Sequence, residues 1–322
     1  MIIQKVNPTI MHEFKKYYEQ HVWDHTAFFF YFTSGMLMFV LKSLKYIPSF
    51  INVQLIGNNL KPEEIEFIDQ HIQAPLFHIQ QSDISDQSVL DMLLQICTNN
   101  FGYMDVDTFV LNPQIFHDIM MIENETAIQC YRTYQIFEKY NVCETNFMYF
   151  NITLCKEIPL TPYSYSYQGD YLSIPKAVLH ELSEMLPVGQ CPIRDYFDTL
   201  ILFQLLCKAR GKKILSIQQN QLKEKDDLDF FHLGNSCFIS NLFTKLSSKA
   251  IHISLHNIKS IFFTRELYNT YMEILPSTYK VFPDLFQQAL ANSDFLDVLS
   301  RIEKNYTIRS INRDLLKTVL AP

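Results

Sequence analysis

Stretches dense in apolar residues alternate with amphipathic stretches along the first third of the chain. Short apolar runs predict strands, whereas apolar residues at every third or fourth position predict helices. Strands and helices that alternate in this way are typical of a parallel sheet with helices on its faces. The expected elements are a strand over 27–32, a helix over 36–46, a strand over 50–56, a helix over 62–71, a strand over 75–79 and a helix over 85–98.

The chain changes character after residue 125. Residues 126–240 mix short strands with one strongly apolar helix, expected over 198–210, which Gly211 would end. From residue 241 onward the apolar spacing is mostly helical. We therefore expect an α/β domain over 1–240, with halves over 25–125 and 126–240, and a helical C-terminal region over 241–322. A homo-oligomer assembled through these C-terminal helices is one expectation.

Composition and charge narrow the class of partner. Apolar residues make up 48% of the 322 residues, which is enough for a sizeable core. The formal net charge is −7, and Lys and Arg are scattered apart from short clusters such as 208–213. Because no basic face is visible, we expect no nucleic acid as partner.

Cysteine usage and hydropathy indicate a cytoplasmic protein. The seven cysteines are widely spaced and form no Cys-x-x-Cys pair, which suits free thiols in a reducing compartment. The apolar run over 27–41 is shorter than the roughly 20 residues of a membrane span and contains Ser34 and Gly35. We expect no transmembrane segment and no targeting signal.

The strongest chemical signal is the pair Asp105 and Asp107, which closes the fourth expected strand. Ligands of parallel sheets collect at the carboxyl ends of the strands. Two carboxylates at this spacing can share a divalent cation such as Mn²⁺ or Mg²⁺, which keeps further positions for phosphate oxygens. The alternative is a pair of solvated aspartates in a turn.

Other phosphate-binding motifs are missing. The seven glycines are too far apart for a Gly-x-Gly-x-x-Gly or Walker A loop. An EF-hand is excluded because Phe109 and Val110 stand where a ligand and a glycine would be needed. A polymerase-type nucleotidyltransferase would need a Gly-Ser shortly before the aspartates, which this sequence lacks.

Two segments, 103–113 (Tyr-Met-Asp-Val-Asp-Thr-Phe-Val-Leu-Asn-Pro) and 145–151 (Thr-Asn-Phe-Met-Tyr-Phe-Asn), together with the strand and helix series, resemble the GT-A class of glycosyltransferases. The resemblance covers roughly residues 25 to 240. It implies a Rossmann-like, mixed but mainly parallel sheet flanked by helices, a UDP- or GDP-sugar donor, and Mn²⁺ or Mg²⁺ as cofactor.

The resemblance also implies roles for particular residues of the donor half. Asp105 would contact the ribose or the sugar, and Asp107 would be the firmer metal ligand. Phe32, Thr33 and Ser34 would lie beside the base and the ribose.

Two later segments resemble further parts of such sites. His232 would be a third metal ligand, with Gly234 and Asn235 beside the diphosphate; a structural turn with a hydrogen-bonded histidine is the alternative. Asp198, which opens the apolar helix, would be the catalytic base of an inverting enzyme, with Asp195 as the substitute. An ordinary helix N-cap is the alternative for Asp198.

These observations predict a metal-dependent glycosyltransferase that moves a sugar onto a glycan, a lipid-linked glycan or a protein. The alternative is an inactive nucleotide-binding or protein-interaction module on the same fold. Nucleotidyl transfer onto a sugar phosphate is a third reading, but it normally needs a glycine-rich N-terminal loop that this chain lacks.

Overall fold

The computed structural model describes residues 6–34, 36–82, 84–158, 176–183, 185, 200–218 and 229–232. The C-terminal region over 241–322, predicted to be helical, lies outside the described residues. The division of the chain into domains therefore stays a prediction.

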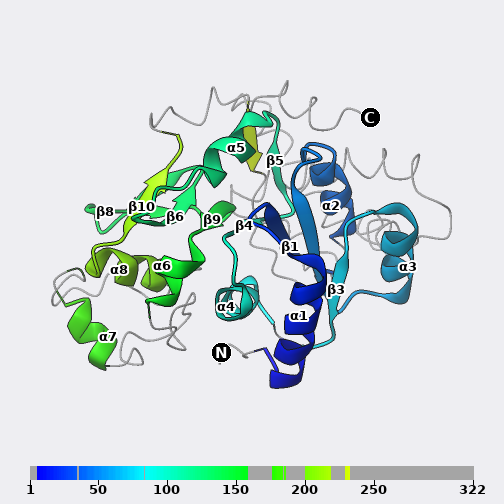
Figure 1. The fold of residues 1–322 in the computed structure, drawn as a ribbon, viewed down its shortest axis with the longest axis horizontal. Coiled ribbons are helices and arrows are strands. Elements are labelled where there is room, and N and C mark those ends of the chain that lie inside the picture. Colours follow the sequence, from blue (N-terminus) through cyan, green and yellow to red (C-terminus); the bar gives the residue numbers. More distant parts are fainter. Residues whose placement is uncertain are drawn as a thin grey trace, which may run out of the picture.

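A seven-stranded mixed sheet forms the centre of the described part (Figure 1). Strands β1 to β4 are parallel, β9 is antiparallel to both of its neighbours, and β10 is parallel to β6. This arrangement confirms the expected mixed, mainly parallel sheet. In spatial order the strands are β10 (Lys213–Ser216), β6 (Thr126–Cys130), β9 (Phe147–Phe150), β4 (Phe101–Met104), β1 (Ala27–Thr33), β2 (Asn52–Asn58) and β3 (Leu76–Ile79).

Two antiparallel strand pairs accompany the main sheet. One joins β5 (Thr108–Val110) to β11 (Phe230–His232), and the other joins β7 (Thr133–Ile136) to β8 (Tyr140–Cys143). The described helices are α1 (Pro8–His21), α2 (Leu37–Leu44), α3 (Pro62–His71), α4 (Asp86–Ile96), α5 (Gln114–Met120), α6 (Ile152–Lys156), α7 (Lys176–Glu181) and α8 (Ile201–Ala209).

The side chains of β1 alternate between two apolar cores, one on each face of the sheet. Phe28, Phe30 and Phe32 belong to the first core, together with residues of α2, α3 and α5. Ala27 and Phe29 belong to the second core, together with residues of α1, α4, α6 and α8. Because helices cover both faces, the edge formed by the carboxyl ends of the parallel strands is where ligands can reach the sheet.

The six elements expected between residues 27 and 98 are all present, with bounds that differ by at most two residues. The first turn of α3 forms as expected, since the backbone N–H of Lys61 donates to the Glu64 carboxylate at 2.9 Å. Gly211 follows α8 with a φ of +72°, a left-handed conformation that glycine adopts readily.

Helix α1 was not expected from the sequence. It buries Phe14, Tyr17 and Tyr18 against the sheet, and the side chain of Asn7 caps its start by accepting from the Thr9 N–H at 2.8 Å. The residues of α1 thus pack against the sheet although they precede the expected range of 25–125.

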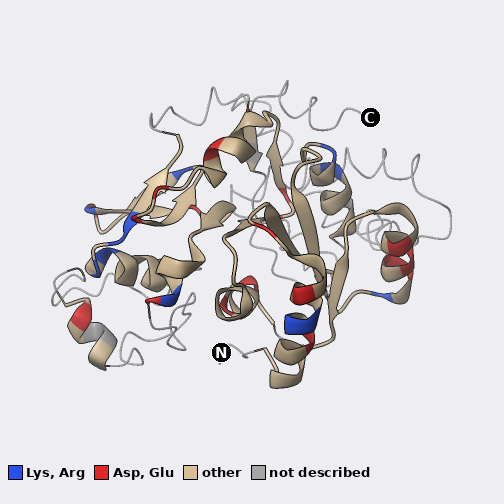
Figure 2. Ribbon diagram, in the orientation of Figure 1, with Lys and Arg blue, Asp and Glu red and all other residues tan. Residues whose placement is uncertain are grey.

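Basic residues are spread over several of the described elements and mixed with acidic ones (Figure 2). Among the described residues, no helix has the length and apolar character that a membrane crossing requires.

Candidate functional site

A tight turn carries the two predicted aspartates away from the end of β4. The Thr108 N–H donates to the Asp105 carbonyl at 3.0 Å, which closes a four-residue turn. The Asp105 N–H in turn donates to the Asn146 carbonyl at 2.9 Å, just before β9. Val106, at the centre of the turn, is buried. These contacts fix the backbone, so that the two carboxylates project from a rigid support.

The strand β11 brings His232 to the same turn. In the antiparallel pair of β5 and β11, His232 lies opposite Thr108. The buried ring of Phe230 anchors β11, because it stacks on Tyr131 with ring centroids 4.0 Å apart. A residue distant in sequence thus joins the aspartates through strand pairing.

The donor atoms of the three side chains lie within 4.8 Å of one another. His232 Nε2 is 3.4 Å from Asp107 Oδ1 and 3.8 Å from Asp105 Oδ2. The Asp107 side chain is 5% exposed, whereas those of Asp105 and His232 are 32% and 30% exposed. Two carboxylates and one imidazole on a half-open surface could hold a divalent cation whose remaining positions face a ligand.

The electrostatics of the cluster are governed by its acidic groups. Burial lowers the pKa of His232, but the carboxylates of Asp107, Asp105 and Glu144 outweigh this effect and leave the pKa above its ordinary value. Excess negative charge of this kind attracts a proton to the imidazole, and it would equally attract a metal cation.

Two residues of this site were not singled out by the sequence. The buried Asn146 places its side-chain nitrogen 3.0 Å from His232 Nδ1 and 3.1 Å from Glu144 Oε2. Asn146 falls within the segment 145–151 that carries the family resemblance, but no spacing rule pointed to its contact with His232. That contact arises only when β9 and β11 are assembled.

The end of β1 lies at the same edge of the sheet as Asp105, since β1 and β4 are parallel neighbours. Thr33 and Ser34 are partly exposed there. The Phe32 side chain is only 1% exposed and belongs to the core, so any contact of Phe32 with a ligand would have to involve its backbone. The nucleoside contacts expected of these three residues stay predictions.

The remaining predicted site residues, Gly234 and Asn235 near the diphosphate and Asp195 and Asp198 as catalytic bases, lie outside the described residues. The described part of the apolar helix begins at Ile201, after both aspartates. Their roles stay predictions.

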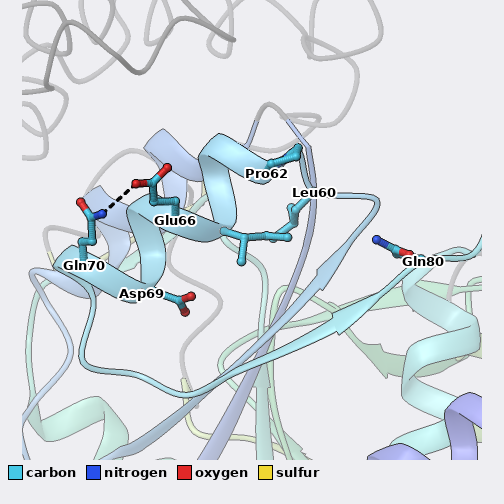
Figure 3. A pocket seen from close by; sticks show the side chains of 7 residues that line it. Leu60, Pro62, Glu66, Asp69, Gln70 and Gln80 are labelled. Carbon is cyan, nitrogen blue, oxygen red and sulfur yellow. Dashed lines mark hydrogen bonds between the residues drawn. The ribbon is translucent and has the colours of Figure 1, made fainter.

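A separate hollow of about 510 Å³ lies beside α3 (Figure 3). Its lining consists of Leu60, Pro62, Ile65, Glu66, Asp69, Gln70 and Gln80. Leu60 follows β2 and Gln80 follows β3, which places the hollow at the carboxyl ends of these strands. The lining carries two acids and no basic side chain, which is a poor match for a diphosphate without a metal.

A comparison with protein-family models finds a match in the first half of the chain. Residues 5–155 match a family model described as the StrH glycosyltransferase N-terminal domain. The matched segment includes Asp105 and Asp107 but not His232. This match confirms the predicted resemblance to glycosyltransferases. A comparison with curated proteins finds no match.

Among the solved structures that match this chain, three illustrate the low identities and TM-scores. GlyE, a glycosyltransferase of Streptococcus pneumoniae TIGR4, shares 12% identity at a TM-score of 0.35, over 72% of this chain and 52% of its own. This chain therefore spans about half the length of GlyE. PcManGT, a mannosyltransferase of Pyrobaculum calidifontis solved with GDP-Man and Mn²⁺, shares 7% identity at a TM-score of 0.35, over 97% and 86% of the two chains.

A cytidylyltransferase of Leptospira borgpetersenii shares 12% identity at a TM-score of 0.36, over 84% of this chain and 97% of its own. At such identities and TM-scores, these structures assign neither a donor nor an acceptor to this chain.

Proposed function

We propose that this protein is a metal-dependent glycosyltransferase that moves a sugar from a nucleoside-diphosphate sugar to an acceptor hydroxyl. The observation that carries the proposal is the convergence of Asp105, Asp107 and His232 within 4.8 Å at the carboxyl end of β4. The glycosyltransferase family match over residues 5–155 supports the same reaction class.

The three side chains fit a divalent cation by their chemistry. Carboxylate oxygens suit Mg²⁺ and Mn²⁺ alike, whereas an imidazole nitrogen favours Mn²⁺ over Mg²⁺. The largely buried Asp107 would be the firmest ligand, because its position is fixed and little solvent competes for it. When bound, the cation would neutralise the charge that develops on the diphosphate leaving group.

The other residues at this edge would bind and orient the donor. Thr33 and Ser34, at the end of β1, would face the ribose or the base, whereas Phe32 would support them from the core. Asp105, whose side chain is more exposed than that of Asp107, would contact the sugar side of the donor as well as the metal. Gly234 and Asn235 would approach the diphosphate.

The second half of the domain would form the acceptor site. If the reaction inverts the anomeric centre, Asp198, or Asp195 in its place, would accept the proton of the attacking hydroxyl. The acceptor would be a glycan, a lipid-linked glycan or a protein. Five described cysteines are free and buried, which supports a cytoplasmic protein.

A thermal-shift screen tests the proposal. UDP, GDP, CMP and the corresponding nucleotide sugars are added with and without Mn²⁺, and the shift is compared in wild type, Asp105→Asn and Asp107→Asn. A ligand at 100 times its Kd stabilises a protein by about 2.7 kcal/mol, so binding should be readily detected. We expect a Mn²⁺-dependent shift with one nucleotide, which both variants lose.

Asp69→Asn is the matched control, since Asp69 lines the hollow beside α3 and not the aspartate cluster. The nucleotide that binds would next be supplied as its sugar donor, and slow release of the nucleoside diphosphate would show turnover. An absence of any shift would contradict the proposal and favour an interaction module on a glycosyltransferase-like fold. Binding without turnover would favour an inactive nucleotide-binding module.

A further inference from the structure

Both ring nitrogens of the His232 imidazole face polar side chains. Its Nε2 faces the carboxylates of Asp105 and Asp107, and its Nδ1 faces the amide of Asn146 at 3.0 Å. Asn146 is only 4% exposed, and its side-chain nitrogen also lies 3.1 Å from Glu144 Oε2. The ring nitrogen that would meet a cation is therefore Nε2, and the nitrogen that would anchor the ring is Nδ1.

A neutral imidazole can bind a metal through Nε2 only if its single N–H is on Nδ1. That N–H would be enclosed by protein and needs an acceptor, because a buried donor without a hydrogen-bond partner destabilises the arrangement. Asn146 is the neighbour of Nδ1, and its amide carries one acceptor atom, Oδ1. This oxygen is buried and has no hydrogen-bond partner among the described residues.

We propose that Asn146 is a positioning residue that directs His232 Nε2 toward the cation. A half-turn of the Asn146 amide exchanges its nitrogen for Oδ1 and presents an acceptor to the Nδ1–H. In the arrangement seen here, the Glu144 carboxylate accepts a hydrogen bond from the Asn146 amide nitrogen. Glu144 is partly exposed, so its carboxylate can turn to water when the amide turns. This inference rests on the proposed metal site and adds a residue outside its ligand set.

The backbone of Asn146 gives this role a structural basis that is separate from its side chain. Its carbonyl accepts from the Asp105 N–H at 2.9 Å and from Thr108 Oγ1 at 3.3 Å. One residue thus contacts the aspartate turn through its backbone and the histidine through its amide. Side-chain substitutions leave the carbonyl in place, so they report on the amide.

The test is a double-mutant cycle on Mn²⁺ affinity, measured by calorimetry on the full chain without nucleotide. The variants are Asn146→Leu, which is close in size and has no hydrogen-bonding group, His232→Ala, and the two combined. Outer contacts of metal ligands typically contribute about 10- to 100-fold in affinity, so we expect Asn146→Leu to weaken Mn²⁺ binding by this factor. In the His232→Ala background the same change should have little further effect.

Asn146→Asp keeps an acceptor oxygen beside Nδ1 and should recover most of the lost affinity. Equal losses from Asn146→Leu with and without His232 would show a general structural effect and overturn the inference, as would an unchanged affinity in Asn146→Leu. A wild-type protein that binds no Mn²⁺, or binds it as well after Asp107→Asn, would instead overturn the metal site itself. The failure of the inference and that of the proposed function therefore give different results.

Discussion

His232 lies opposite Thr108 in the antiparallel pair of β11 and β5, and this pairing sets its imidazole 3.4 Å from the carboxylate of Asp107. Thr108 directly follows Asp107 in the chain, so one short strand pair joins a histidine to an aspartate far from it in sequence. This relationship gives the cluster a titration behaviour that can be measured.

We expect His232 to make the stability of the metal-free protein depend on pH. Burial lowers its pKa, but Asp107, Asp105 and Glu144 raise it above the ordinary 6.5. A group with a raised pKa in the folded state stabilises the fold fully below its unfolded pKa and loses this effect as the pH rises through the folded value. The excess melting temperature of wild type over His232→Gln should therefore be largest below about pH 6.5 and decline above it.

Thermal unfolding in the presence of a chelator, over a series of pH values, measures this difference. In an Asp107→Asn background the pH dependence of the difference should be much smaller, since the principal partner charge is gone. A difference that grows with rising pH would contradict the assigned electrostatics.

Gly102 should be intolerant of any side chain. It pairs with Phe28 in the sheet, and a Cβ built on Gly102 would lie 2.1 Å from the Phe28 ring. Gly102→Ala should destabilise the protein by about 1–3 kcal/mol, the usual cost of overpacking a core. Denaturant unfolding checks this value. Combination with Phe28→Leu should cost less than the sum of the two single changes, and strict additivity would show that the ring is not the obstacle.

Gln204 should stabilise the packing of α8 against β8. It is fully buried, its Oε1 accepts from the Cys143 N–H at 2.6 Å, and its Nε2 donates to the Cys143 carbonyl at 3.3 Å. Gln204→Leu leaves both backbone groups unpaired and should cost about 1–3 kcal/mol in the free energy of unfolding. The same substitution at the exposed Gln135 should change it by less than about 0.5 kcal/mol. Equal effects at both positions would contradict the assigned role.

The alternating elements of the first hundred residues could be predicted because each has a local signal. Helix α3 matches its predicted range, since proline and two acids mark its first turn. Helix α1 was missed although Phe14, Tyr17 and Tyr18 have helical spacing, because they lie among charged residues. The place of β9 between β4 and β6 depends on pairing between distant segments, which local patterns do not encode.

Some residues of the site could likewise be predicted from a local sequence signal, whereas others are identified only by contacts between distant segments. Asp105 and Asp107 stand out in the sequence as acids that close an apolar strand, and His232 was connected to them only through the family resemblance. Asn146 and Glu144 had no signal of their own, because Asn146 meets His232 only through the strand pair of β5 and β11, and Glu144 joins them through its contact with Asn146. Outer contacts of this kind require a three-dimensional structure.

The binding of Mn²⁺ itself is the most direct test of the proposed metal centre. Electron paramagnetic resonance measures the loss of the free-ion signal as protein is added. We expect one site in the wild type, strengthened by the nucleoside diphosphate that the thermal screen selects. Asp107→Asn should lose the site, whereas Asp69→Asn should retain it. Unchanged Mn²⁺ binding after Asp107→Asn, or no binding by the wild type with or without nucleotide, would contradict the claim that the cluster of Asp105, Asp107 and His232 is a metal centre.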